Sequence, residues 1–113
     1  MSDKSASKKI ADFKPSVIDL RNIISKLASD SANVAWTSHA QKRMVERDIC
    51  DLDALRVLRI GEIEGDIVAG NNPGEWKCKV VSPVRGGRDI GVVSVVAHRQ
   101  RIIVKTVEWE DIS

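Results

Sequence analysis

The spacing of apolar residues along this 113-residue chain changes once, at Gly61. Before Gly61, apolar residues recur at the spacing of amphipathic helices, and Gly61 itself stands where a helix often ends in the left-handed conformation. After it, β-branched residues alternate with polar ones, and short turns separate the segments. The expected helices are residues 15–29, 39–48 and 52–60. The expected strands are residues 62–68, 75–82, 90–97 and 102–108.

This order predicts an α+β domain in which N-terminal helices pack on a C-terminal, mainly antiparallel four-stranded sheet, because short loops favour antiparallel neighbours. Residues 34–36 form a further apolar run that is long enough for a short first strand. Residues 1–13 are rich in Lys and Ser and predict a flexible tail, which leaves residues 14–113 as one domain. The expected core residues are Val17, Leu20, Ile24, Leu27, Leu52, Leu55, Leu58, Val92 and Val104.

Composition limits the classes of protein to which the chain can belong. It has no apolar run long enough to span a membrane and no signal core, and its two cysteines form no CxxC pair. A cytoplasmic protein with reduced thiols and no membrane partner is expected. The potential zinc ligands His39, Cys50, Cys78 and His98 lack ligand spacing, so neither a metal nor a cofactor is predicted.

The segment from Ser38 to Arg47 carries the strongest candidate site. Ser38 and Gln41 have the spacing of a capping box, which places His39 at the start of a helix. His39, Arg43 and Arg47 then follow at i, i+4 and i+8 and form one stripe along the edge of the core. Arginines one turn apart repel each other unless an anion lies between them, so the stripe indicates an anion such as phosphate.

These residue types suit RNA cleavage without a metal. A histidine near a helix N-terminus, where the dipole disfavours a positive charge, can act as the base for the 2′-hydroxyl, and two arginines can stabilise the phosphorane. The acid for the 5′ oxygen would come from Lys77, Lys79, Lys105 or His98.

A structural interpretation of the stripe is the alternative, and the residues alone favour it. Arg43 and Arg47 would pair with Glu46, Asp51 or the acidic residues of segment 62–66, and His39 would bond to a carbonyl oxygen.

Basic residues gather in the predicted sheet, with seven between positions 77 and 105 against one acidic residue. Lys77 and Lys79 alternate with apolar residues and project from one strand face, which with Lys105 is a candidate RNA-binding surface. The alternative is that these lysines only keep an exposed face of the sheet soluble. Trp76, between apolar neighbours, favours a core position, whereas Trp109, between two glutamates, is the better candidate for a surface contact.

The run from His39 to Ile49, a glycine after the next helix and a closing Ile-x-Lys-Thr-Val strand together resemble a family of small bacterial domains of unknown function, similar to the BrnT and RelE toxins. The resemblance covers about residues 36–109. It implies a helix-then-sheet fold like that of RelE and BrnT, RNA cleavage without metal, and an antitoxin partner. The positions that match the motif are His39, Arg43, Glu46, Arg47 and Thr106. Relatives often carry an aromatic residue directly after Thr-Val, whereas here Glu108 precedes Trp109.

The sequence therefore predicts a metal-independent endoribonuclease of the toxin–antitoxin type. His39, Arg43 and Arg47 are the expected catalytic residues, with Glu46, Thr106 and Trp109 in support. The alternative is a non-catalytic module that binds RNA or a protein partner, and a homo-oligomer is compatible with either.

Overall fold

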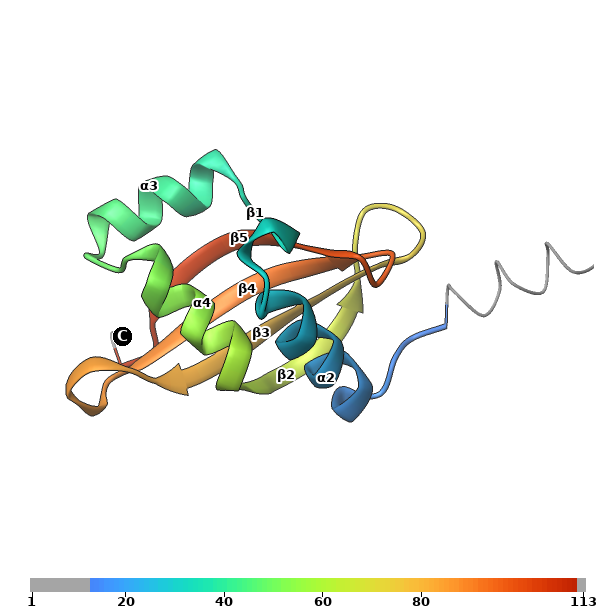
Figure 1. Cartoon of the computed structure of the whole chain (residues 1–113), viewed down its shortest axis with the longest axis horizontal. Coiled ribbons are helices and arrows are strands. Elements are labelled where there is room, and N and C mark those ends of the chain that lie inside the picture. The colour runs from blue at the N-terminus through green and yellow to red at the C-terminus, as the bar shows by residue number, and fades with distance from the viewer. Residues whose placement is uncertain (1–12, 112–113) are drawn as a thin grey trace, which may run out of the picture.

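The computed structural model describes residues 13–111, so the tail predicted for residues 1–13 lies outside the described part except for Phe13. The helices are α2 (Val17–Ala28), α3 (Ser38–Glu46) and α4 (Asp51–Ile60), with short 3₁₀ turns η1 (Ser31–Asn33) and η2 (Arg85–Gly87). The strands are β1 (Val34–Trp36), β2 (Glu62–Ala69), β3 (Glu75–Pro83), β4 (Asp89–Ala97) and β5 (Arg101–Trp109). The predicted α+β class is confirmed (Figure 1).

The sheet has five strands in the order β1-β5-β4-β3-β2, so the predicted four-stranded sheet was one strand short. Strands β2 to β5 form the expected antiparallel meander, but β1 pairs with β5 in parallel, and the sheet is mixed. The apolar run at residues 34–36, which the sequence offered as a short first strand, is strand β1. Its partner lies at the other end of the chain, so no local pattern predicts the pairing.

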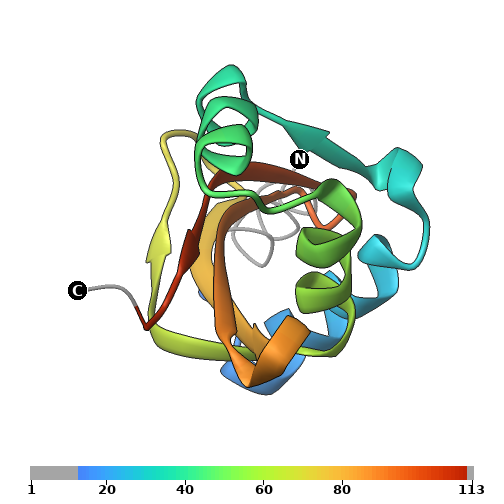
Figure 2. The same ribbon diagram turned by 90° about the vertical axis from the view of Figure 1, so that its left-hand side faces the viewer.

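Helices α2 and α4 cover one face of the sheet, and α3 lies along the outer edge of β5 (Figures 1 and 2). Within the described residues, the opposite face of the sheet carries no helix. The core lies between the two helices and the sheet. Its largest fully buried side chains are Leu20, Ile24, Leu58, Ile90, Ile102, Val57, Val80, Val92, Val96, Val104 and Val107.

Two residues expected in the core are exposed. Val17 is 49% and Leu52 is 69% exposed, and Leu27 is only half-buried. Val17 and Leu52 both stand in the first turn of their helix, ahead of its first buried residue, Leu20 in α2 and Ala54 in α4. Helical spacing gives the buried side of a helix but not the turn at which packing begins.

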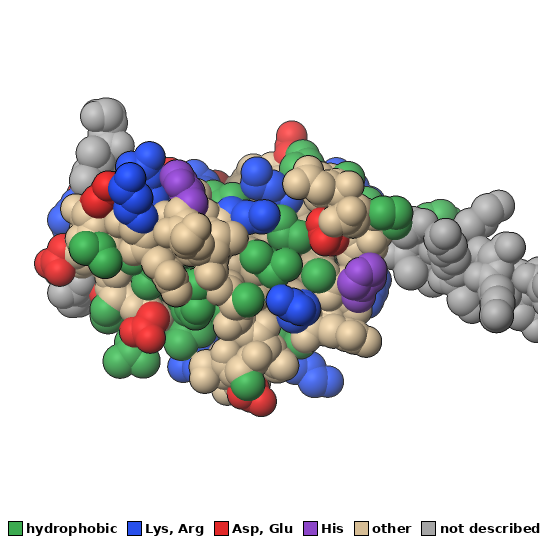
Figure 3. Space-filling model, turned by 90° about the horizontal axis from the view of Figure 1, so that it is seen from above, with side chains coloured by type: hydrophobic (Ala, Val, Ile, Leu, Met, Phe, Trp, Pro, Cys, Tyr) green, Lys and Arg blue, Asp and Glu red, His purple; other side chains and the backbone are tan. Residues whose placement is uncertain are grey.

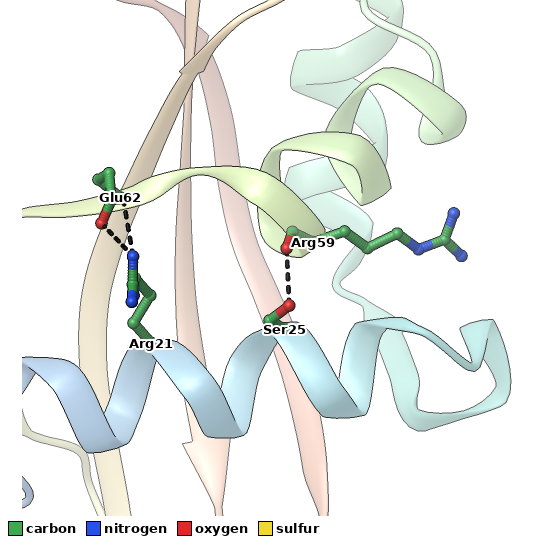
Figure 4. Close-up of polar contacts among 4 residues, drawn as sticks. All are labelled: Arg21, Ser25, Arg59 and Glu62. Carbon is green, nitrogen blue, oxygen red and sulfur yellow. Dashed lines mark hydrogen bonds and ion pairs between the residues drawn. The ribbon is translucent and has the colours of Figure 1, made fainter.

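Polar contacts fix α2 to α4 and β2 (Figure 4). The guanidinium of Arg21 donates to both carboxylate oxygens of Glu62, at 2.8 and 3.0 Å, and the hydroxyl of Ser25 donates to the backbone oxygen of Arg59 at 2.7 Å. The side chain of Arg59 extends away from these residues, and its Nε donates to the backbone oxygen of Ala28 at 2.7 Å. The ends of α2 and α4 are thereby held together.

The two ends of α4 differ from the prediction. The helix begins at Asp51, one residue before the expected start, and its N-cap residue Cys50 makes no side-chain capping bond. Gly61 is extended, with φ −79° and ψ 176°, and not left-handed. A glycine is needed there for space, because a Cβ would stand 2.6 Å from the backbone oxygen of Val57 and 2.8 Å from that of Val81.

Candidate functional site at the junction of α3 and β5

The helix that carries the stripe begins one residue earlier than the capping box predicts. Its N-cap is Thr37, whose Oγ1 accepts a hydrogen bond from the backbone N–H of Ala40 at 3.0 Å. The Ser38–Gln41 box was therefore wrong by one position, since a threonine in extended conformation caps a helix as well. His39 becomes the second helical residue, in the turn whose N–H groups have no intrahelical acceptor.

Thr37 also joins this first turn to β5. Its backbone N–H donates to the oxygen of Val104 at 3.1 Å, and its hydroxyl donates to the backbone oxygen of Lys105 at 3.3 Å. Lys105 is the extra residue of a β-bulge in β5 and directly precedes Thr106. The structure thus brings the turn that holds His39 to the strand segment that holds Lys105 and Thr106.

At the other end of the stripe, two hydrogen bonds join the end of α3 to β5. The guanidinium of Arg47 donates to the backbone oxygen of Val107 at 2.7 Å, and the indole of Trp109 donates to the backbone oxygen of Arg47 at 2.7 Å. Trp109 is half-buried and packs against the core, unlike the surface contact that the sequence favoured. Arg47 therefore bonds within the protein, and its contact orients the end of α3.

The three stripe positions differ in what their side chains touch. Arg43 is half-buried, and its guanidinium donates to the carboxylate of Glu46 at 2.8 Å, as the structural interpretation expected. His39 is exposed and makes no hydrogen bond or ion pair within residues 13–111. Figure 3 shows basic side chains gathered beside one of the chain's two histidines at the α3 end of the molecule, well away from the other. The structure does not bring His98 to the stripe, because His98 lies in the β4–β5 turn before Arg101, whereas the turn that holds His39 is bonded to Val104 and Lys105.

Lys77 and Lys79 both lie on the helix-free face of the sheet. In β3 they alternate with Cys78 and Val80, which are buried in the core beneath α4. Lys77 is exposed, whereas Lys79 is half-buried. The alternation expected from the sequence is present, but the two lysines have different surroundings.

Lys79 is surrounded by carboxylates. Its Nζ lies 2.8 Å from an oxygen of Glu110 and 3.9 Å from one of Glu64, and the pair with Glu110 is largely enclosed, with exposed side-chain fractions of 29% and 16%. The hydrogen bond to Glu110 raises the pKa of Lys79, and the charges of Glu110, Glu108 and Glu64 add to that effect. Gly91 makes room for the pair, since a Cβ there would collide with Glu110. The positive charge of Lys79 is therefore compensated inside the protein.

A cavity of about 270 Å³ opens where Trp109 meets the loop after α3, and its lining includes Asp48, Gly86 and Arg88. Arg88 donates to both oxygens of Asp111, at 3.0 and 3.2 Å, and its guanidinium lies 4.0 Å from the centre of the Trp109 ring. The hydrogen bond from Arg88 lowers the pKa of Asp111. From the sequence alone Arg88 is one of the seven basic residues between positions 77 and 105. It lies beside Trp109 because β4 pairs with β5 so that Ile90 faces Trp109.

The possible zinc ligands remain scattered. Cys78 is buried, and burial raises its pKa to about 11, whereas Cys50 is exposed. Among residues 13–111 no three His, Cys, Asp or Glu side chains are grouped so that they could hold a metal ion. No helix of that part is long and apolar enough to cross a membrane.

Comparison with protein families places this helix and strand in one known domain. A family model described as a domain of unknown function, DUF4258, matches residues 36–109. The chain belongs to this family. No curated protein and no solved structure matches it. The DUF4258 domain runs from the last residue of β1 to the last of β5, so it includes the whole α3–β5 junction, whereas α2 and η1 lie outside the match.

Proposed function

We propose that this DUF4258 domain is a metal-independent endoribonuclease of the toxin–antitoxin type, similar in fold and chemistry to the RelE and BrnT toxins. The observation that carries the proposal is the state of His39, which is exposed in the first turn of α3 and has no hydrogen bond or ion pair to residues 13–111. Its charged motif neighbours, Arg43, Glu46 and Arg47, are occupied by contacts within the protein. His39 is therefore the residue of this helix motif whose side chain is available for proton transfer.

In the proposed reaction His39 accepts the proton of a ribose 2′-hydroxyl. The 2′ oxygen forms a bond to the adjacent phosphorus, and the bond from phosphorus to the 5′ oxygen breaks. The products are a 2′,3′-cyclic phosphate and a 5′-hydroxyl end, whose oxygen takes up a proton. We assign that proton to Lys105, because the backbone oxygen of Lys105 is bonded to Thr37, the cap of the turn that carries His39.

The arginines take different roles in this proposal. Arg43 uses one guanidinium nitrogen for Glu46, and its other N–H groups remain for the charge that develops on the phosphorane. Arg47 is a positioning residue, because its guanidinium is bonded to Val107 and its backbone oxygen to Trp109. Lys77 would hold the RNA backbone, and Lys79 would contribute less because its charge is compensated by Glu110.

A non-catalytic module that binds RNA or a protein is the second candidate. The internal contacts of Arg43, Arg47 and Lys79 favour it, because cations that are already paired contribute less to a transition state. In both candidates the protein acts in the cytoplasm, and an antitoxin is the expected partner of the toxin.

Cleavage of labelled RNA in EDTA, with and without ribosomes, separates the two candidates. The ribonuclease proposal expects fragments that end in a 2′,3′-cyclic phosphate, formed as fast in EDTA as without it. RNA that binds and stays intact in both reactions would contradict the proposal and leave the binding module.

A further inference from the structure

A second cavity, of about 410 Å³, lies between the C-terminal end of α2 with η1 on one side and Arg99 of the β4–β5 turn on the other. Its volume is within the range of pockets that bind small molecules. It lies partly outside the DUF4258 match, because α2 and η1 precede residue 36. The cavity is therefore separate from the α3–β5 junction and from the function proposed for it.

Most polar side chains on the α2 side of the cavity hold the local backbone. The hydroxyl of Ser29 donates to the backbone oxygen of Lys26 at 2.6 Å. The side-chain amide of Asn33 donates to the backbone oxygen of Leu27 at 3.1 Å. Asp30 caps η1 by accepting from a backbone N–H at 3.0 Å. These three side chains shape the wall and have few groups left for a ligand.

Two cations of the lining are uncommitted. Lys26 and Arg99 are exposed, and within residues 13–111 neither side chain makes a hydrogen bond or an ion pair. Ile23 and Leu27 also line the cavity and are partly buried against the core. The lining thus carries two positive charges against the single negative charge of Asp30, beside an apolar surface, which suits an anion with an apolar body.

The turn that carries Arg99 is held in an uncommon conformation. His98 and Arg99 both have positive φ, 54° and 56°, which side chains other than glycine adopt at a cost. The backbone N–H of His98 donates to the oxygen of Gly74 at 2.9 Å, and the imidazole packs so closely on Gly74 that a Cβ there would stand 2.7 Å from Nδ1. This packing fixes the backbone from which Arg99 reaches the cavity.

We propose that this cavity binds a compact organic phosphate of the size and charge of a nucleoside monophosphate. Lys26 and Arg99 meet the phosphate, and Ile23 and Leu27 support the apolar face of the base. A free nucleotide and the 5′-phosphorylated end of an RNA strand present the same chemistry. The proposal gives α2 a role in ligand binding, and it holds whether or not the α3–β5 junction cleaves RNA.

Calorimetric titration of the full chain tests the proposal, with AMP, adenosine, inorganic phosphate and a 5′-phosphorylated trinucleotide as probes. The variants are Lys26→Gln and Arg99→Asn, because asparagine tolerates a positive φ. Arg101→Gln is the matched control, since Arg101 is an exposed cation two residues from Arg99 and does not line the cavity. Melting temperatures establish that each variant is folded.

AMP or the trinucleotide is expected to bind saturably, more tightly than adenosine or phosphate alone. Each of Lys26→Gln and Arg99→Asn should weaken that binding about tenfold, the effect of losing one charged hydrogen bond, and Arg101→Gln should leave it unchanged. Tighter binding of the trinucleotide than of AMP identifies an RNA end as the ligand, and the reverse identifies a free nucleotide. The proposal is overturned if neither probe binds at millimolar concentration, or if binding is the same in both variants as in the wild type.

Discussion

The indole N–H of Trp109 donates a 2.7 Å hydrogen bond to the backbone oxygen of Arg47, while the guanidinium of Arg47 donates a bond of the same length to the backbone oxygen of Val107. One bond thus runs from Arg47 to β5 and the other from β5 back to Arg47, although the two segments are far apart in the chain. The end of α3 is tied to the end of β5, and with it the helix that carries His39 and Arg43.

Trp109→Phe should destabilise the fold beyond the loss of ring area, because the carbonyl of Arg47 loses its donor. A cost of about 1 kcal/mol is expected for the hydrogen bond. Urea unfolding measures it, with Trp76→Phe as control, since Trp76 is also half-buried against the core and its indole makes no hydrogen bond within residues 13–111. Equal losses in the two variants would show that the bond to Arg47 contributes nothing.

Gly61→Ala should be costly although the backbone of Gly61 is ordinary. The added Cβ would meet two backbone oxygens at 2.6 and 2.8 Å, and backbone cannot rotate away as a side chain does. Overpacking of this kind costs roughly 1 to 3 kcal/mol. Gly86→Asn is the control, because Gly86 has φ +65° with open space around its Cβ position, and asparagine tolerates that conformation. A Gly61→Ala variant as stable as Gly86→Asn would contradict the close approach.

The buried thiol of Cys78 makes stability fall at alkaline pH. Burial raises its pKa from 9.0 to about 11, so the unfolded chain loses this proton first. The free energy of unfolding that the protonated thiol contributes is fully present below pH 9 and is lost as the pH rises through 11. About 1 kcal/mol of it is lost by pH 10. Urea unfolding at pH 8 and pH 10 should show this loss in the wild type and a smaller one in Cys78→Val. Lys79, whose pKa is also raised, is present in both proteins and cancels. Identical pH dependence in the two would refute the assignment.

The α+β class, the meander and most helix and strand positions follow from the sequence, because they depend on the spacing of apolar residues between glycine and proline turns. The parallel pairing of Val34 with Ile102 does not, since it joins two ends of the chain that share no local pattern. The spacing of apolar residues also fails to predict that Val17 and Leu52 are exposed, because exposure depends on contacts with other elements. Where packing begins along a helix is set by the neighbouring elements.

The candidate site was predictable as a stripe but not as a set of contacts. Helical spacing puts His39 and Arg43 on one side of α3, with Arg47 as its C-cap residue, and only the fold shows that Arg47 meets the backbone of Val107. The basic strand was predictable in the same limited way. Lys79 is compensated by Glu110, which lies 31 positions further along the chain.

The three lysines should contribute unequally to RNA affinity. Lys77→Gln and Lys105→Gln should each weaken binding and reduce the slope of log Kd against log salt concentration by about one, whereas Lys79→Gln should change the slope little, because Glu110 already neutralises Lys79. Filter binding at several salt concentrations measures the slopes, and a melting temperature for each variant checks the fold. A full loss of one unit in Lys79→Gln would show that RNA displaces Glu110.

Cleavage of labelled RNA by the His39→Ala variant tests most directly whether His39 is the general base. The His98→Asn variant is the control for the chain's other histidine. If His39 takes the 2′-hydroxyl proton, cleavage in EDTA should fall by roughly 100- to 10,000-fold in His39→Ala, the range for loss of a general base. The Kd for RNA should stay close to that of the wild type, and His98→Asn should cut normally. Cleavage by His39→Ala at the wild-type rate, or no cleavage by the wild type even with ribosomes, would contradict the proposed function.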